Sequence, residues 1–168
     1  MCRVLKCDKY RITQYYSNKD KAIDMVKYYS ATCPIIAHTE GTIVFCQTGQ
    51  KNNPKATGNA SYGNCVKIKH PDGYYTLYAH MEKVYVKKNQ YVSKGQEIGY
   101  MGNTGRSFGS HLHFEVRTKN DTRLNPQPYL DANLPDTNVT FPFCNTKSWT
   151  SPDDLFEVNA DELNTVEE

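Results

Sequence analysis

Apolar and polar residues alternate in several short segments of the chain, and turn-forming residues separate these segments. Three of them, at 41–46, 64–69 and 74–79, lie between Cys33 and Arg117. Alternation with a period of two predicts half-buried β-strands, and the 13 Tyr residues favour strands over helices. The sequence therefore predicts an all-β fold that is mainly antiparallel.

Two turn motifs connect the expected strands. In Pro71-Asp72-Gly73, Pro fixes a negative φ and Gly accepts a positive one, so residues 64–70 and 74–80 are predicted to form a hairpin. Ser93-Lys94-Gly95-Gln96 is a second turn of similar composition. Residues 47–61 are polar and lack periodicity, which predicts a long loop of the kind that borders a binding site.

The pattern becomes irregular beyond Pro126, where further Pro residues interrupt it. Ser151-Pro152-Asp153 supplies an N-cap, a Pro at the first helical position and an acidic first turn, which predicts a short terminal helix. We expect one domain at residues 1–132, with its core at 10–130. A C-terminal extension at 133–168 ends in an acidic tail.

The charge is distributed unevenly along the 168 residues. The net charge is +2, but the last sixteen residues, from Asp153, hold seven of the 18 acidic residues and no Lys or Arg. Residues 1–152 therefore form a basic body, which suits anionic partners such as nucleic acid, a membrane surface or cell-wall polymers. Charge alone does not choose among these partners.

Neither the N-terminus nor the six Cys residues indicate export. No apolar run approaches the roughly 18 residues of a membrane span, and the first ten residues lack the apolar core of a signal peptide. We expect cytoplasmic synthesis, with release by lysis, association with a phage particle or tail, or a separately encoded export signal. The Cys residues show no Cys-x-x-Cys spacing and are interpreted mainly as reduced, partly buried side chains.

Candidate chemistry lies at 111–117, His-Leu-His-Phe-Glu-Val-Arg. A strand here would place His111, His113, Glu115 and Arg117 on one face, so that two imidazoles point the same way. A third imidazole, His80, ends the predicted hairpin and is expected on the polar side of its strand with Thr76 and Tyr78. A His-x-His strand alone is more often surface decoration than a metal site.

Between these segments, residues 99–110 contain four Gly residues. They predict a tight connection in which the backbone comes close to a ligand. A Gly-rich loop can also cradle phosphate, but no helix signature follows it, which disfavours a nucleotide site.

The segments at 62–64, 73–80, 94–99, 102–107 and 111–116 resemble, in order, those of the lysostaphin-type or LytM-like zinc endopeptidases. These proteins are peptidoglycan hydrolases with the duplicated-hybrid-motif β fold. The resemblance covers roughly residues 10–130 and ends in a similar segment at 124–130. It implies zinc, hydrolysis of stem or cross-bridge peptides of the bacterial cell wall, and contact with anionic wall polymers. Nucleic acid is not an expected partner.

The resemblance also implies roles for individual residues. His113 and Asp24 match metal ligands, and His80 and His111 match the catalytic pair. The position of the family's first ligand, a His, is occupied by Asp20. Two carboxylates and one imidazole leave bound Zn²⁺ with no net charge, which lowers the pKa of its water less than the family's set does.

Other interpretations of these residues remain open. Ser17-Asn18-Lys19-Asp20 has capping-box-like spacing, and Ala22, Ile23 and Val26 are compatible with an amphipathic helix. Tyr15, Tyr16 and Tyr62 are candidates for lining a substrate groove, although Tyr on a strand more often serves packing.

Two other functions compete with the peptidase. A degenerate relative would keep the fold and bind wall peptides or a protein partner without cleavage. A lipoyl-type carrier would use Asp20-Lys21-Ala22 as its attachment motif. The carrier is disfavoured because that motif belongs at a hairpin tip and because a carrier needs no His-x-His.

Overall fold

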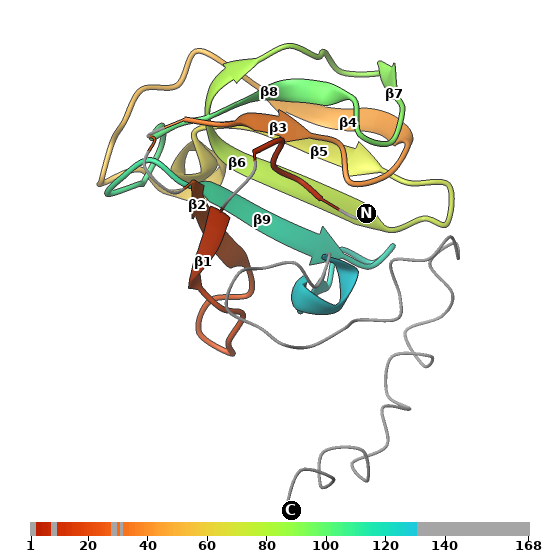
Figure 1. Ribbon diagram of the computed structural model, residues 1–168, viewed down its shortest axis with the longest axis horizontal. Coiled ribbons are helices and arrows are strands. Elements are labelled where there is room, and N and C mark those ends of the chain that lie inside the picture. The colour runs from red at the N-terminus through yellow and green to blue at the C-terminus, as the bar shows by residue number, and fades with distance from the viewer. Residues whose placement is uncertain (1–2, 8–9, 28–29, 31, 131–168) are drawn as a thin grey trace, which may run out of the picture.

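Ten β-strands form one antiparallel sheet (Figure 1). The protein is seen in a computed structural model that describes residues 3–7, 10–27, 30 and 32–130. The strands are β1 (Tyr10–Gln14), β2 (Ile23–Lys27), β3 (Pro34–Ile36), β4 (Gly41–Gln47), β5 (Asn64–Lys69), β6 (Tyr75–Val84), β7 (Tyr91–Val92), β8 (Glu97–Met101), β9 (Leu112–Arg117) and β10 (Arg123–Leu124). Two 3-10 helices, η1 (Gly58–Tyr62) and η2 (Gln127–Tyr129), lie in the connections. The predicted all-β, mainly antiparallel fold is confirmed.

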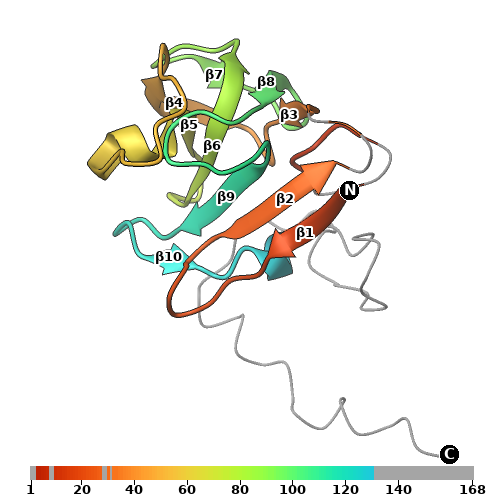
Figure 2. The same ribbon diagram turned by 90° about the vertical axis from the view of Figure 1, so that its left-hand side faces the viewer.

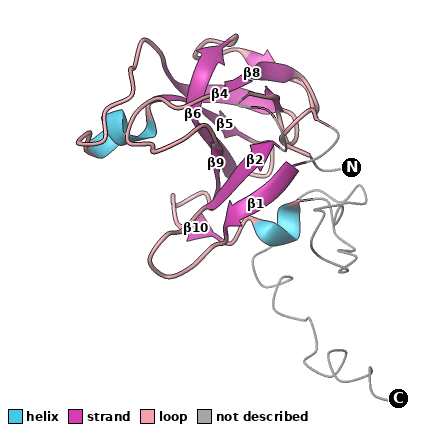
Figure 3. Ribbon diagram, turned by 60° about the vertical axis from the view of Figure 1, so that its left-hand side comes forward, coloured by secondary structure: helices cyan, strands magenta, loops and turns pink. Residues whose placement is uncertain are grey.

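The long strands β6 and β9 lie at the centre of the sheet. The strand order is β1-β2-β9-β6-β5-β4-β7, and β10 pairs with β9. The short strand β8 pairs with both β6 and β3. Strands distant in sequence are therefore neighbours, and Figure 2 shows β1, β2, β9 and β6 side by side. Figure 3 shows the loops and η1 beyond the ends of these strands.

Both predicted turns are present. Strands β5 and β6 form the expected antiparallel hairpin. Gly73 has φ 87° and donates its N–H to the His70 carbonyl at 3.0 Å. In the second turn Gly95 has φ 76°, and Gln96 donates to the Ser93 carbonyl at 3.0 Å. Positive φ is tolerated best by Gly, which explains its place in each turn.

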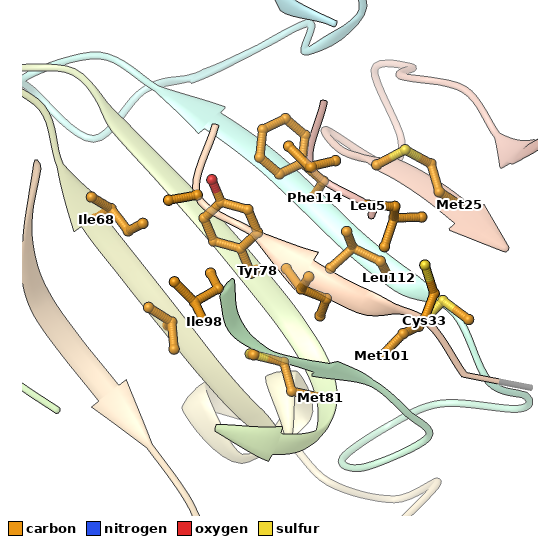
Figure 4. Close-up of a cluster of buried hydrophobic side chains, with 14 of the residues drawn as sticks. Leu5, Met25, Cys33, Ile68, Tyr78, Met81, Ile98, Met101, Leu112 and Phe114 are labelled. Atoms are coloured by element: carbon orange, nitrogen blue, oxygen red, sulfur yellow. The ribbon is translucent and has the colours of Figure 1, made fainter. Parts of the chain in front are cut away.

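The hydrophobic core lies on one face of the central strands. Leu112, Phe114 and Val116 of β9 point into it, beside Tyr78 of β6 and Met25 of β2. Leu5 of the N-terminal segment and Ile98 and Met101 of β8 pack in the same cluster (Figure 4), which also contains Ile35 of β3. The alternation of β9 places His113, Glu115 and Arg117 on the opposite face. Because one face of β9 is buried in the core, the candidate site residues of β9 lie on its other face.

Thr76 and Tyr78 do not lie on a polar side with His80, as the sequence analysis expected. Both are fully buried. His70 Nε2, the Thr76 hydroxyl and the Tyr78 hydroxyl are hydrogen-bonded in a chain, with distances of 2.8 and 3.2 Å. The backbone N–H of His38 donates to the Tyr78 hydroxyl at 2.8 Å. These polar groups enter the core because they satisfy one another there.

The helical interpretation of residues 17–26 is wrong. The backbone N–H of Asp20 does bind Ser17 Oγ at 3.0 Å, as in a helix cap, but the next regular element is strand β2. Ile23 and Met25 both point into the core. Residues two positions apart share one face of a strand, so a strand accounts for this pattern. The expected terminal helix and acidic tail lie outside the described residues.

Gly105 of the Gly-rich connection approaches the loop before β5, whereas Gly99 and Gly102 approach β6 and Gly109 has open space around it. A Cβ on Gly105 would lie 2.3 Å from the Gly63 nitrogen, and one on Gly63 would lie 2.4 Å from the Thr104 carbonyl carbon. Both glycines also have positive φ, 71° and 65°. The loop before β5 and the connection before β9 thus fit together backbone against backbone, which only Gly permits.

The cysteines of the described part include two that are fully buried, Cys33 and Cys65, as small hydrophobic side chains are. Cys7 and Cys46 are partly exposed. Within the described residues, no helix is both long enough and apolar enough to cross a membrane.

Acid should destabilise the fold through His38. Burial lowers the pKa of His38 to about 4, whereas the pKa of His in an unfolded chain is near the ordinary value of 6.5. Between these values the unfolded chain binds the extra proton, so stability is lost as pH falls from 6.5 towards 4. For His38 alone the loss is about 2 kcal/mol at pH 5 relative to pH 8.

The measurement is urea unfolding of the parent and of His38→Gln at both pH values. Gln retains an amide N–H for the Tyr129 carbonyl, which His38 Nε2 meets at 2.5 Å, but it does not titrate. The variant should lose less stability between pH 8 and pH 5 than the parent. An equal loss in both proteins would contradict the assignment to His38.

Candidate active site

Four polar or small residues form a row across strands β1, β2, β9 and β6. Gln14 pairs with Asp24, Asp24 with His113, and His113 with Ala79. Directly opposed residues of an antiparallel pair point to the same face. Asp24 Oδ1 and His113 Nδ1 accordingly lie 3.0 Å apart. Two residues separated by 89 positions are brought together by strand register alone.

His80 reaches the same face through a backbone irregularity. Strand alternation after Ala79 would direct its side chain into the core. The pairing of β5 with β6 shifts register between Asn64 and Val66, so β6 carries one extra residue there. His80 also has φ 59°, in the left-handed region that disfavours side chains with a Cβ. Together the bulge and this conformation turn the imidazole towards His111 and His113.

Hydrogen bonds determine which ring nitrogen of His80 and of His111 carries the proton. His80 Nδ1 lies 2.8 Å from the Thr104 carbonyl, and His111 Nδ1 lies 2.9 Å from the Gly109 carbonyl. A carbonyl oxygen only accepts, so each Nδ1 carries the proton and each Nε2 is an acceptor in the neutral ring. Burial, followed by the nearby His111, lowers the pKa of His80 to about 4. His80 is therefore neutral at pH 7.

The three imidazoles surround one point. The ring centroids of His80 and His111 are 4.7 Å apart, and those of His80 and His113 are 5.6 Å apart. His111 Nε2 lies 3.7 Å from Asp24 Oδ2. All of these groups line an open cavity of about 690 Å³, together with Tyr62, Phe108 and Asp20. The site is accessible to a ligand from solvent.

A charged network supports His113 from behind. His113 Nε2 lies 3.0 Å from Glu115 Oε1, and the Glu115 side chain is 1% exposed. Arg117 Nε donates to Glu115 Oε2 at 2.6 Å, and Arg123 Nε lies 3.3 Å from the same oxygen. Arg117 and Arg123 also donate to the Tyr62 hydroxyl, at 3.0 and 2.5 Å. The ring of His113 is thus held between Asp24 and Glu115.

This network controls the charge of His113 and Glu115. Burial alone would raise the pKa of Glu115, but the hydrogen bond with His113 and the charge of Arg117 lower it to about 2. Burial alone would lower the pKa of His113, but hydrogen bonds to Asp24 and Glu115 raise it to about 9. In the metal-free protein His113 is therefore a cation between two anions.

Asp20 lines the cavity but lies apart from the Asp24–His113 pair. Its Oδ2 accepts a hydrogen bond of 2.5 Å from Gln14 Nε2. Across the residues that the structure describes, no three His, Cys, Asp or Glu side chains are grouped closely enough to hold a metal ion. The structure brings four of the five predicted site residues together and leaves Asp20 on the adjacent wall.

Other residues of the site agree less well with the sequence analysis. Tyr62 lines the cavity as expected, but Tyr15 and Tyr16 are outside its lining, and the Tyr16 hydroxyl instead donates to the Arg123 carbonyl at 3.3 Å. Two residues of the site were not predicted from the sequence: Thr104, whose carbonyl orients His80, and Arg123, which helps neutralise Glu115. Thr104 lies between Gly102 and Gly105, and this Gly-rich context could have identified it from the sequence as a residue near the site. No local pattern distinguishes Arg123.

The donor atoms are suitable for zinc. Neighbouring ligands with bonds of about 2.0–2.1 Å in a tetrahedral shell lie about 3.3 Å apart, close to the separation of Asp24 Oδ1 and His113 Nδ1. The contact of His113 Nε2 with Glu115 is the arrangement that orients a metal-binding His. Asp24 and His113 therefore suit zinc in both the type of donor atom and its position. Asp20 suits zinc in the type of donor atom.

An antiparallel β protein with imidazoles and a carboxylate around an open cavity has the features of a metal-dependent hydrolase. Comparison with known proteins gives a more specific result. The sequence profile of Peptidase family M23 matches residues 18–126, which contain the whole cluster. The chain belongs to peptidase family M23, a family of zinc metallopeptidases that act on peptidoglycan.

Individual relatives agree with this result. The chain is 40% identical over 102 residues to the peptidoglycan DD-endopeptidase ShyA of Vibrio cholerae, covering 61% of this chain and 20% of the relative. It is 41% identical over 98 residues to the murein hydrolase activator NlpD of Escherichia coli, covering 57% and 22%. The catalytic domain of lysostaphin from Staphylococcus simulans superposes with a TM-score of 0.60 and 28% identity, covering 71% of this chain and 91% of that domain. The matched region thus spans about a fifth of each of these two curated relatives.

Removing the buried charge of Glu115 should destabilise the protein. Glu115→Gln leaves Arg117, whose side chain is 10% exposed, without its buried counter-ion. Breaking a buried ion pair from one side costs about 3–5 kcal/mol. Urea unfolding should show a loss in this range.

Asp121→Asn is the matched control, because Asp121 also pairs with Arg117, at 2.8 Å, but is 54% exposed. Its loss should stay below about 1 kcal/mol, as for exposed pairs. Equal losses in the two variants would show that burial of Glu115 is not the decisive factor.

Proposed function

We propose that the protein is a zinc-dependent endopeptidase that hydrolyses peptide bonds in the stem or cross-bridge peptides of bacterial peptidoglycan. The observation that carries the proposal is the convergence of Asp24, His80, His111 and His113 in one open cavity. Membership of family M23 and the similarity to a DD-endopeptidase support the same reaction.

In this proposal zinc is held by Asp24 and His113, with Asp20 as the third protein ligand. Asp20 would have to exchange its hydrogen bond with Gln14 for the metal, and it lines the same cavity as Asp24 and His113. When bound, the ion supplies Lewis-acid chemistry, which polarises the scissile carbonyl and acidifies a water molecule. Asp24 and Glu115 fix the ring of His113 from both sides.

His80 and His111 are the proposed catalytic pair. Each keeps its Nδ1 proton in a hydrogen bond to a backbone carbonyl, which orients the ring and leaves Nε2 as the acceptor. Nε2 of one imidazole accepts the proton of the attacking water. The other ring stabilises the oxyanion of the tetrahedral species once its own Nε2 is protonated, because only an N–H can donate to that oxygen. Both rings are held in place before the substrate arrives, which lowers the cost of orienting them.

The shape of the surface suits an extended peptide. A second cavity of about 550 Å³ lies next to the first and shares Ser61, Tyr62 and Arg123 with it. Phe45 and Leu77 give it an apolar part, and Lys67, Arg117 and Arg123 give it positive charge. A peptide across the first cavity would continue past Tyr62 into the second. Stem peptides carry carboxylates, which complement these cations.

A second function is favoured by one observation. Asp20 replaces the His of the family's ligand set and is hydrogen-bonded to Gln14 in the structure. If Asp20 does not join the metal, the site would have too few ligands for strong binding, and the protein would bind wall peptides or a protein partner without cleavage. The similarity to the murein hydrolase activator NlpD is compatible with this alternative.

Zinc stoichiometry distinguishes a site in which Asp20 is a metal ligand from a site in which it is not. His113→Ala should abolish zinc binding, because it removes the only imidazole ligand. Asp20→Asn should weaken binding, and Asp20→His should raise both affinity and turnover by restoring the family's set. The metal is measured in protein purified without added zinc and then by titration.

Asp121→Asn serves as the control for a carboxylate away from the proposed ligands and should bind zinc as the parent does. If Asp20→Asn and Asp20→His both leave zinc affinity at the parent value, Asp20 is not a ligand.

Replacing the catalytic pair should separate metal binding from catalysis. His80→Ala and His111→Ala should keep zinc near the parent level while lowering peptidoglycan cleavage by roughly 10²–10⁴-fold, the usual effect of a lost acid–base group. Cleavage is followed as release of free amines from purified cell walls, with zinc determined on the same samples. A parent protein that holds one zinc but releases no amines from walls of several chemotypes would favour the binding module.

A further inference from the structure

Two cysteines face each other where the N-terminal segment pairs with the chain at β3. Leu5 forms an antiparallel bridge with Ile35. Lys6 donates its N–H to the Pro34 carbonyl, and Ile36 donates to the Val4 carbonyl, each at 2.9 Å. These two bonds flank Leu5 and Ile35, which makes them a non-hydrogen-bonded pair. Continued two residues further, the same register would place Cys7 opposite Cys33, although the regular pairing ends at Leu5 and Ile35 because Pro34 has no N–H to donate.

This alignment of Cys7 with Cys33 is that of a non-hydrogen-bonded pair. In such pairs the Cα atoms are about 4.5 Å apart and both side chains leave on the same side, within the range that a disulfide spans. The two thiols are in fact hydrogen-bonded, which together with burial raises the pKa of Cys33. Cys33 is fully buried beside Met101, whose N–H binds the Cys33 carbonyl, whereas Cys7 is partly exposed (Figure 4).

We propose that Cys7 and Cys33 are a modification site, at which a small disulfide such as oxidised glutathione converts the two thiols into an intramolecular disulfide. The deprotonated sulfur of Cys7, the accessible partner, attacks the glutathione disulfide, forms a mixed disulfide and releases one glutathione thiolate. The deprotonated sulfur of Cys33 then attacks the sulfur of Cys7 and releases the second. Two protein thiols are oxidised and one glutathione disulfide is reduced to two glutathione molecules.

The cross-link would enclose the part of the chain that carries both candidate metal carboxylates. The closed loop runs from residue 7 to residue 33 and includes β1, β2, Asp20 and Asp24. A disulfide across a loop of this length restricts the unfolded chain, and little backbone movement is needed to form it. The inference rests on strand register and does not depend on the proposed peptidase activity.

The test is oxidation of the full-length protein with a glutathione redox buffer, followed by alkylation of remaining thiols, non-reducing proteolysis and mass spectrometry. The expected product is a peptide pair linked through Cys7 and Cys33. The melting temperature of the oxidised protein should exceed that of the reduced protein by roughly 5–10 °C.

Cys7→Ser is the main variant, because it alters a partly exposed position and leaves the buried Cys33 in place. It should show no linked peptide and no rise in melting temperature on oxidation. Cys46→Ser, at another partly exposed Cys, should behave as the parent does. The inference is overturned if Cys7 is alkylated in the oxidised parent, if it is linked to a cysteine other than Cys33, or if Cys7→Ser retains the rise.

Discussion

The buried carboxylate of Glu115 is the charge around which the rest of the site is arranged. It is almost inaccessible to solvent, and its ionised form exists because Arg117, Arg123 and His113 surround it. An ionised group in such a place is strongly unfavourable unless it is paired and hydrogen-bonded. The same contacts orient His113 towards Asp24 and position the Tyr62 hydroxyl between the two cavities. The contacts that hold β9 in the sheet therefore also hold the site together.

The sequence predicted the features that depend on local patterns. Alternation along 111–117 assigns His113, Glu115 and Arg117 to one face, because side-chain direction in a strand follows from position alone. The hairpin of β5 and β6 follows from Pro and Gly at their required φ values. Such signals are contained within a few residues, which is why the all-β fold could be predicted without knowledge of tertiary contacts.

Features that depend on long-range register could not be predicted in this way. His80 faces the site because β6 has an extra residue opposite β5. The sequence Ala79-His80-Met81 contains no pattern that predicts this bulge. The facing of Cys7 and Cys33 depends on how the N-terminal segment pairs with β3. The cap-like spacing at Ser17 left a helix open as an alternative, but the burial of Ile23 and Met25 in the sheet prevailed over local preference. The roles of His80, His111, Asp20 and Asp24 were inferred from family resemblance and remain proposals.

The left-handed backbone of His80 has an evolutionary consequence. A side chain in this region costs of order 1–2 kcal/mol that Gly would not incur, and the hydrogen bond of His80 to the Thr104 carbonyl offsets only part of that cost. Under the proposed function, selection for stability and selection for hydrolysis oppose each other at this single position. A lineage released from the need to cleave peptides would drift towards Gly or Asn at residue 80 and become more stable as it lost the reaction. If the proposed function holds, the residue at position 80 should differ between relatives that cleave peptides and relatives that only bind them.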